Sequence, residues 1–293
     1  QAQSIRPINT FTIGFEVDGF NEAENAKVIA HHLGTNHTEL YLTSADALAV
    51  VPVLPAIWDE PFADSSQIPT LLLSRLTRQH VCVALSGDGG DELFCGYNRY
   101  NHGYDLYQCL KYLPSPLRKQ LISAIRIAPA HLIDRLINHL PVKLHYSSVS
   151  DRLQKLANVL GHSKSPNFYN SIVSCFQDPT SFVLRGSEPD CTLMHEQSLP
   201  TMVDYRELMM ALDTLIYLPD DILTKVDRAS MASSLETRMP FLDHNLIEWA
   251  WQLPFDLKLN RGQSKWILRQ VLERHIPKTF IDRPKMGFDV PIE

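Results

Sequence analysis

Val81-Cys-Val-Ala-Leu85 runs directly into Ser86-Gly-Asp-Gly-Gly-Asp-Glu92, and this stretch decides the fold. Five apolar residues without a charge are typical of a strand that is buried on both faces of a parallel sheet. The glycines and acids that follow predict a tight turn at the carboxyl end of the strand, which is the edge where α/β folds bind ligands. The alternative interpretation is a plain strand-to-helix turn with solvated acids.

The acidic residues of this turn indicate which kind of ligand could bind there. A helix that starts after the glycines favours an anion such as a phosphate, but three acids in the same turn repel one. A magnesium ion between carboxylate and phosphate resolves that conflict. No Gly-Lys-Ser/Thr follows, and the pattern is not the Gly-x-Gly-x-x-Gly of dinucleotide-binding proteins. The turn therefore predicts a site for metal and nucleotide together.

Upstream of this stretch the pattern predicts a β–α–β unit. Residues 10–15 and 37–42 have the alternation and composition of strands. Between them apolar residues recur at helical spacing, and Gly34 follows as the expected C-terminal glycine. Further helices are predicted to begin with Ser44 as N-cap and to open at Pro69. Two parallel strands joined by a right-handed crossover are the expected result.

Beyond about residue 100 the strand signals fade. Residues 105–139, 151–176 and 203–275 show helical spacing, and residues 176–202 are predicted to be a long loop. The predicted fold class is α/β, a parallel twisted sheet with flanking helices plus a large helical portion. Residues 1–100 form the α/β part of this division and residues 101–293 form the mainly helical part.

Charged residues of the helical part give weaker signals. A helix that begins near Pro219 would place Asp221, Lys225 and Arg228 on one face, as a solvated ion-pair ladder or as the wall of a polar cleft. Residues 236–243 are predicted to be a helix end and a turn, with Arg238 and Asp243 in internal pairs that fix it. Residues 282–291 form a predicted loop that includes a lysine, and residues 58–66 form a polar loop before a helix.

Composition excludes several classes of protein. The 293 residues are 44% hydrophobic with a formal net charge of −6, which argues against a protein built to bind nucleic acid. The five cysteines include no C-x-x-C pair, so neither a disulfide framework nor a zinc site is indicated. No apolar run reaches the roughly 18 residues of a membrane span. We expect a cytoplasmic protein with no membrane partner.

Several pieces together resemble one family. They are Thr10-Phe-Thr-Ile-Gly-Phe15, His32-Leu-Gly-Thr-Asn-His-Thr-Glu39, the turn at residues 86–92, the stretch at residues 225–243 and Arg283-Pro-Lys-Met-Gly-Phe288. In this order they resemble the synthetase (C-terminal) domain of glutamine-hydrolysing asparagine synthetases. The resemblance covers nearly the whole chain, residues 1–293. It implies a fold of the adenine nucleotide α-hydrolase-like, ATP-pyrophosphatase type.

The resemblance also implies a reaction. In this family the side-chain carboxylate of aspartate attacks the α-phosphorus of ATP, giving an acyl-adenylate and magnesium pyrophosphate. Ammonia from an N-terminal glutaminase domain then displaces AMP to form the amide. A carboxylate is a poor acceptor for ammonia, and adenylation turns one of its oxygens into a leaving group. ATP and Mg²⁺ are thus the implied cofactors, and a homodimer is a further expectation.

Carried over residue by residue, the resemblance assigns roles to single positions. Ser86 and Gly87 are expected to contact ATP, and Ile13 to offer backbone contacts to the adenine. Asp91 is expected to be a magnesium ligand. The remaining expectations concern catalysis and the substrate side: Lys285 stabilises the adenylation transition state, Asp88 handles protons or contacts substrate, and Asp64, Asp221 and Lys225 line the substrate side.

Two departures from the family pattern affect these expectations. The pyrophosphate loop Ser-Gly-Gly-x-Asp-Ser is expected just before residues 10–15 and does not occur, and the glutaminase domain is absent from this sequence. We therefore expect a fragment of a longer enzyme that has little or no activity alone. Two alternatives stay open: a paralogue that amidates another carboxylate, such as a sugar acid or a cyclising amino acid, and a non-catalytic nucleotide-binding or scaffold module.

Overall fold

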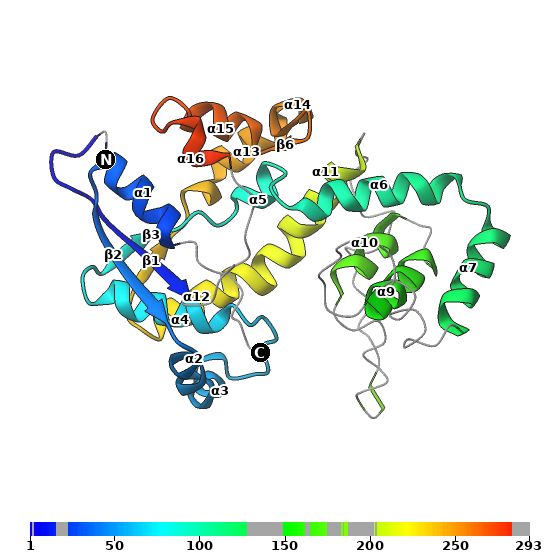
Figure 1. Cartoon of the computed structure of the whole chain (residues 1–293), viewed down its shortest axis with the longest axis horizontal. Helices are drawn as coiled ribbons and strands as arrows, with labels where there is room; N and C mark the ends of the chain where they lie inside the picture. The colour runs from blue at the N-terminus through cyan, green and yellow to red at the C-terminus, as the bar shows by residue number, and fades with distance from the viewer. Residues whose placement is uncertain are drawn as a thin grey trace, which may run out of the picture. The chain divides into compact units, whose positions relative to one another are not determined.

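The structure of the chain is a computed structural model (Figure 1), and it describes residues 1, 3–15, 23–127, 149–161, 165–174, 183, 185–186, 202 and 204–282. Contacts divide the chain into two compact units, Gln1–Gly96 with Ala211–Glu293, and Tyr97–Met210. The sequence suggested a change of character near residue 100 but gave no sign that the last part of the chain groups with the first. The first unit holds every described residue that the sequence predicts to be functional.

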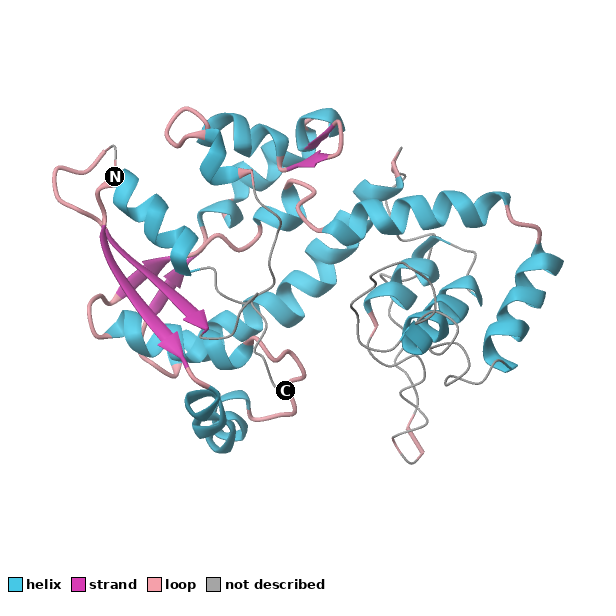
Figure 2. Ribbon diagram, in the orientation of Figure 1, coloured by secondary structure: helices cyan, strands magenta, loops and turns pink. Residues whose placement is uncertain are grey.

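The first unit opens with the predicted β–α–β motif, visible in Figure 2. β1 (Asn9–Phe15) pairs in parallel with β2 (Asn36–Leu42), and α1 (Ala23–Leu33) connects them. Gly34 has the positive φ of 66° that ends such a helix, so its predicted role is confirmed. Apolar side chains form the core against this pair: Ile13, Phe15, Leu42 and Ala47, with Leu40, Ile68, Leu72 and Leu73 packed on them.

Helical elements follow β2: α2 (Ser44–Val50), η1 (Val51–Val53), α3 (Leu54–Trp58) and α4 (Gln67–Arg78). The N-cap of α2 is Thr43, so the prediction of Ser44 as N-cap is wrong by one residue. Thr43 has an extended backbone, and its hydroxyl accepts the N–H of Asp46 at 3.2 Å. The Asp46 carboxylate accepts the Thr43 N–H at 2.9 Å in return, which completes a capping box.

The deciding strand, β3 (Val83–Leu85), pairs in parallel with β4 (Glu236–Arg238). The expectation that this strand is buried on both faces is wrong, because Val83 is 42% and Leu85 74% exposed. Among the described residues β3–β4 and β1–β2 are separate two-stranded sheets, so β3 lacks the covering neighbours of a central strand. The prediction of a helix end at residues 236–238 is also wrong.

A continuous helical run leads back into the first unit: α11 (Tyr205–Leu212), the π-helical segment η4 (Asp213–Leu223) and α12 (Thr224–Met231). The predicted helix start near Pro219 is wrong, because Pro219 lies inside η4. A π-helical turn is one of the places where a helix absorbs a proline, which has no N–H to donate. α12 packs against α4 and β4, and η4 packs against α5 (Gly90–Leu93).

The end of the described chain is mostly helical: η5 (Pro240–Leu242), α13 (His244–Gln252), α14 (Phe255–Lys258), the hairpin β5 (Leu259–Asn260) and β6 (Gln263–Ser264), α15 (Trp266–Leu272) and α16 (Lys278–Ile281). Arg238 pairs with Glu236 at 2.7 Å, and Asp243 caps α13 by accepting the N–H of Asn245 at 3.0 Å. Leu93 and Phe94 are buried against α13 and α15, which anchors the turn that precedes them.

The second unit is helical in its described residues: α6 (Asn98–Tyr112), α7 (Ser115–Ile127), α9 (Val149–Gly161), α10 (Ser165–Val173) and most of α11 (Figure 1). Its core is aromatic, with Tyr107 stacked on Tyr205 at a centroid distance of 4.0 Å and Phe168 beside both. The predicted helical character of this region is confirmed for these elements.

Parallel strand pairs with flanking helices, and a mainly helical remainder, agree with the predicted α/β class. One parallel sheet that unites the strands is not seen within the described ranges, where each sheet has two strands. In the same ranges, no helix combines the length and the apolar character that a membrane span requires.

Candidate active site

The turn after β3 is held by backbone and side-chain hydrogen bonds. The Ser86 N–H donates to the carbonyl of Arg238 at 2.9 Å, which extends the β3–β4 pairing into the turn. The Ser86 hydroxyl donates to the Asp88 carboxylate, and the Asp88 N–H donates to the same hydroxyl oxygen at 3.3 Å. Two residues that the sequence predicts to be functional, Ser86 and Asp88, are thereby fixed to one another.

Gly89 makes the turn sterically feasible. Its φ of +88° lies in the left-handed region, and it is the N-cap of α5. A β-carbon at this position would lie 2.4 Å from Leu242 of η5. The glycine therefore meets both a backbone and a packing requirement. At Gly87, in contrast, a β-carbon would meet nothing within 4 Å, so this position has open space beside it.

Asp91 lies in the first turn of α5 and forms an ion pair that the sequence did not predict. Its Oδ2 lies 3.1 Å from the Nζ of Lys265, the residue that precedes α15. Both side chains keep contact with solvent, at 24% and 32% exposure. No local pattern marks Lys265 as functional, because it lies about 170 residues further along the chain in a short hairpin-to-helix junction.

The structure brings together the three residues predicted for the substrate side. Lys225 in α12 is only 7% exposed, and its Nζ bonds the carboxylate of Asp64. The same nitrogen lies 3.8 Å from Oδ1 of Asp221, one helical turn earlier. Arg228, predicted on the same face, pairs instead with Asp59 at 2.8 Å on the exposed surface. The charged residues of this helix face therefore form two groups. Lys225 with Asp64 and Asp221 is a largely buried group, called the α12 cluster below, and Arg228 with Asp59 is a solvated pair.

The buried cluster has a defined charge state. Burial raises the pKa of the Asp64 carboxyl, but the hydrogen bond and charge of Lys225 and two hydrogen bonds from Ser66 lower it further, so the pKa lies below its ordinary value. Asp64 therefore stays ionised at neutral pH. Because Asp64 precedes α4 and Lys225 belongs to α12, the pair ties two packed helices together.

The two remaining predicted residues are Ile13 and Lys285. Ile13 is 3% exposed in the middle of β1, where it lies opposite Leu40 in the parallel pairing and contributes its side chain to the core. The Ile13 side chain is therefore buried away from any ligand, and the predicted backbone contact with adenine stays a prediction. Lys285 lies outside the described residues.

Asp88 and Asp91 supply carboxylate oxygens within one turn, which suit magnesium. Mg²⁺ is usually held by one or two carboxylates together with substrate phosphates, and keeps several waters. No group of three or more His, Cys, Asp or Glu residues that could hold a metal ion occurs in the described part of the chain. The donor set therefore fits magnesium with one or two carboxylates as protein ligands, while waters or phosphate oxygens complete the coordination.

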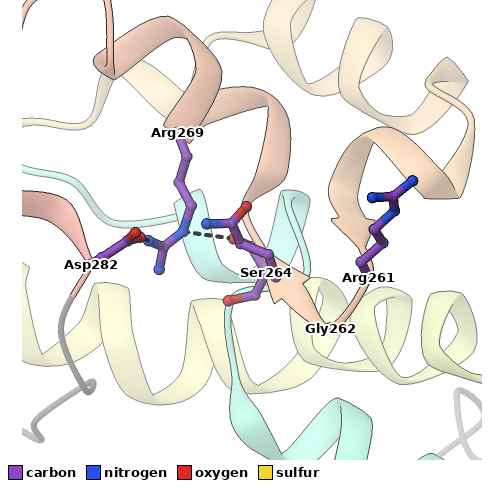
Figure 3. Close-up of a pocket in the computed structure, with 6 residues that line it drawn as sticks. Arg261, Gly262, Ser264, Arg269 and Asp282 are labelled. Atoms are coloured by element: carbon purple, nitrogen blue, oxygen red, sulfur yellow. Dashed lines mark hydrogen bonds and ion pairs between the residues drawn. The ribbon is translucent and has the colours of Figure 1, made fainter. Parts of the chain in front are cut away.

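A separate polar pocket of about 380 Å³ lies at the hairpin near the end of the described chain (Figure 3). It is lined by Arg261, Gly262, Gln263, Ser264, Arg269 and Asp282. Arg269 is already engaged, since it donates to the Ser264 carbonyl at 3.0 Å and lies 3.4 Å from the Asp282 carboxylate. None of the lining residues belongs to the predicted site, and these contacts serve to hold the hairpin on α15.

Comparisons with known proteins agree with the resemblance. The asparagine synthase family model matches residues 1–293. The chain is 33% identical over 288 residues to a putative asparagine synthetase [glutamine-hydrolyzing] of Mycobacterium tuberculosis strain H37Rv, covering 97% of this chain and 41% of that protein. It is 31% identical over 299 residues to asparagine synthetase [glutamine-hydrolyzing] 1 of Bacillus subtilis, covering 97% of this chain and 43% of the relative.

A more distant relative is the amidase chyE of Penicillium rubens, 22% identical over 306 residues, which cover 96% of this chain and 43% of that protein. The chain thus spans about two fifths of the length of the curated relatives it matches. The family model includes the turn after β3 and the cluster of Asp64, Asp221 and Lys225, and each of the two bacterial relatives matches 97% of the chain. The chain belongs to the asparagine synthase family.

Proposed function

We propose that this chain is the amide-forming part of an ATP-dependent ligase that converts aspartate to asparagine. The observation that carries the proposal is the turn at residues 86–92. It follows a parallel strand, fixes Ser86 against Asp88 and presents Asp91 at the start of α5, in a chain of the asparagine synthase family. The nucleotide would lie at this edge of the sheet, as ligands of α/β folds do.

In the proposed reaction a side-chain carboxylate oxygen of aspartate attacks the α-phosphorus of ATP, and pyrophosphate leaves. Ammonia then attacks the carbonyl carbon of the acyl-adenylate, loses a proton and expels AMP. When bound, magnesium would neutralise charge on the phosphates. Asp91 would hold it together with phosphate oxygens, Asp88 would handle protons or contact substrate, and Ser86 and Gly87 would contact the nucleotide.

The α12 cluster provides a rigid wall on the substrate side. Lys225 is held by Asp64 and Asp221, and η4, which carries Asp221, packs against α5. A fixed wall next to the turn restricts how a substrate can lie, and orientation of this kind lowers the entropy cost of reaction. We assign Lys225 a positioning role, because its ammonium already forms ion pairs with the carboxylates of Asp64 and Asp221.

Further parts of the proposal concern residues and partners beyond this geometry. Lys285 is proposed to stabilise the transition state of adenylation, and Ile13 to contact the adenine through its backbone. A glutaminase domain is proposed as the source of ammonia. A cytoplasmic location and a homodimer complete the proposal.

Pyrophosphate release tests the proposal. The full-length protein is incubated with ATP, Mg²⁺, an ammonium salt and aspartate, and we expect pyrophosphate and AMP to form only when aspartate is present. Asp91→Asn should raise the Mg²⁺ concentration for half-maximal rate at least about tenfold, because one carboxylate ligand is lost. Asp105→Asn, at an exposed position of α6, is the matched control and should leave the Mg²⁺ curve unchanged. ATP turnover without any carboxylate would contradict the proposal.

A second candidate function is the same ATP-dependent amidation with a carboxylic acid other than aspartate as the substrate. The likeness to a protein named amidase favours it. In this case the chain would amidate another carboxylate, such as a sugar acid or a cyclising amino acid. The same assay decides between the two: turnover of a uronic acid together with failure of aspartate would favour the second candidate.

A further inference from the structure

The pair formed by Lys265 and Asp91 connects a proposed metal ligand to a lysine that no prediction included. Lys265 Nζ lies 3.1 Å from Asp91 Oδ2. The backbone N–H of Lys265 donates to the carbonyl of Phe94 at 3.1 Å, so main chain and side chain both contact the segment that follows the turn. Lys265 thus reaches the turn from a distant part of the chain, and both its backbone N–H and its side-chain ammonium are held there.

The backbone of Lys265 is unusual in a way that supports a specific role. Its φ of 53° and ψ of 36° lie in the left-handed region, which a residue with a side chain adopts only at a cost. Residues held in such conformations persist where the surrounding structure imposes them, and they are concentrated at functional sites. The surrounding structure holds Lys265 in this conformation, and its ammonium lies next to the carboxylate of Asp91.

Gly96 is shaped to admit this pair. A β-carbon at position 96 would lie 2.0 Å from Asp91 Oδ1 and 2.3 Å from Cε of Lys265, and both distances are far too short. The Gly96 N–H also donates to the Asp91 carbonyl at 2.8 Å, which fixes the close approach. Backbone, carboxylate and ammonium are thus packed into one small space.

We propose that Lys265 acts as a resident cation for Asp91: it holds the carboxylate in place without metal and competes with the divalent cation for it. The inference rests on the proposed function in one respect, the role of Asp91 as a metal ligand. An ammonium and a divalent cation next to the same carboxylate repel each other, so each lowers the affinity of the other. Lys265 therefore sets the metal affinity of the turn at a lower value than the carboxylates alone would give.

Binding of the metal alone tests this inference. Mn²⁺ is titrated into the full-length protein without nucleotide, and free Mn²⁺ is followed by electron paramagnetic resonance. Lys265→Met and Lys265→Gln should each bind Mn²⁺ about fivefold to tenfold more tightly at low salt, with a smaller gain at high salt because both side chains are partly exposed. Lys278→Met is the matched control, since it removes an exposed lysine that pairs with Asp282 at 3.8 Å. Unchanged or weaker binding in both neutral variants of Lys265 overturns the inference.

Asp91→Asn separates this inference from the proposed function. If Asp91→Asn binds Mn²⁺ as well as the unaltered protein does, Asp91 is not a metal ligand and both claims fail. If Asp91→Asn loses Mn²⁺ while the Lys265 variants gain nothing, only the inference about Lys265 fails. A role of Lys265 in stability alone predicts a lower melting temperature with unchanged Mn²⁺ affinity, and this result also overturns the inference.

The unaltered protein gives a second test that does not depend on the folding of variants. Lysines are acetylated briefly with acetic anhydride, with and without millimolar Mn²⁺, and the modified positions are found by mass spectrometry. Metal that displaces the ammonium should increase acetylation of Lys265 severalfold, while Lys278 should not change. Equal acetylation of Lys265 in both samples contradicts the competition.

Discussion

Replacement of Lys225 by methionine tests how the α12 cluster is built. Methionine keeps much of the length and apolar stem of lysine but removes the ammonium that contacts Asp64 and Asp221. Two carboxylates then remain close together without a counter-charge, and Asp64 keeps only its hydrogen bonds from Ser66. We expect the first unit to lose stability, because one partner of a largely buried pair is gone.

The size of this loss follows from burial. Removing one member of a fully buried ion pair costs about 3–5 kcal/mol. The Asp64 and Asp221 side chains retain 21% and 29% exposure, so water can replace part of the interaction. We therefore expect a loss of about 2–3 kcal/mol in the free energy of unfolding. In a unit of this size each kcal/mol shifts the melting temperature by about 2–4 °C, which gives a decrease of about 4–12 °C.

Thermal unfolding followed by circular dichroism measures the shift, with Lys278→Met as the control at an exposed pair. The pH dependence adds a second check. The folded-state pKa of Asp64 lies below its ordinary value of about 3.9, so its contribution is present above that pH and is lost as the pH falls through the folded-state pKa. The gap between unaltered and Lys225→Met protein should be constant from pH 8 to pH 6 and shrink below about pH 4. A decrease no larger than that of the control at pH 7 would refute the cluster as a stabilising element.

Three further predictions concern local structure. Thr43→Ala should lower the free energy of unfolding by about 1 kcal/mol in urea denaturation while Ser44→Ala changes it little, since Thr43 is the N-cap of α2; equal effects would contradict that capping. Gly89→Ala should cost about 1–3 kcal/mol in the same assay because of its positive φ and its close contact, and a neutral result would argue against the turn geometry. The hydrogen bond from Tyr41 to Glu39 raises the pKa of the Tyr41 phenol to about 12, so NMR of labelled tyrosine should show it ionising well above the ordinary value of about 10. Any stability that this hydrogen bond provides is lost as the pH rises towards the raised pKa, and ionisation near the ordinary value would contradict the prediction.

Local patterns were enough to predict the β–α–β motif. Alternation in residues 10–15, helical spacing before Gly34 and alternation again in residues 37–42 all depend on neighbours in the sequence. Each element there matches its own composition, so prediction and structure agree. Helix spacing likewise anticipated α6, α7 and α9 in the second unit.

The strand β4 could not be predicted in this way. Glu236-Thr-Arg238 is short and polar, and nothing in its composition favours a strand. Its conformation comes from the partner strand, since the Glu236 N–H donates to the Cys82 carbonyl at 2.9 Å. A strand defined by a partner about 150 residues away has no local signal. The exposure of Leu85 has a related cause, because burial depends on which strands and helices lie against β3.

In the candidate site, too, local patterns predicted some features, while others depend on partners that are distant in the sequence. Composition marked the turn at residues 86–92, and the i, i+4 spacing already suggested the contact between Asp221 and Lys225. The contact of Lys225 with Asp64 spans 161 positions in the sequence, and only family resemblance placed both on one side. Lys265 carried no signal at all, because its importance comes from the space left by Gly96 and from the carboxylate it meets there.

Transfer of an oxygen atom tests the proposed adenylation most directly. Aspartate labelled with ¹⁸O in its side-chain carboxyl is incubated with the full-length protein, ATP, Mg²⁺ and an ammonium salt, and the AMP is analysed by mass spectrometry. If the carboxylate oxygen attacks the α-phosphorus and ammonia then expels AMP, one labelled oxygen from the carboxyl group must remain on each AMP. We predict AMP with one ¹⁸O for each asparagine formed, whereas unlabelled AMP would contradict the proposed reaction.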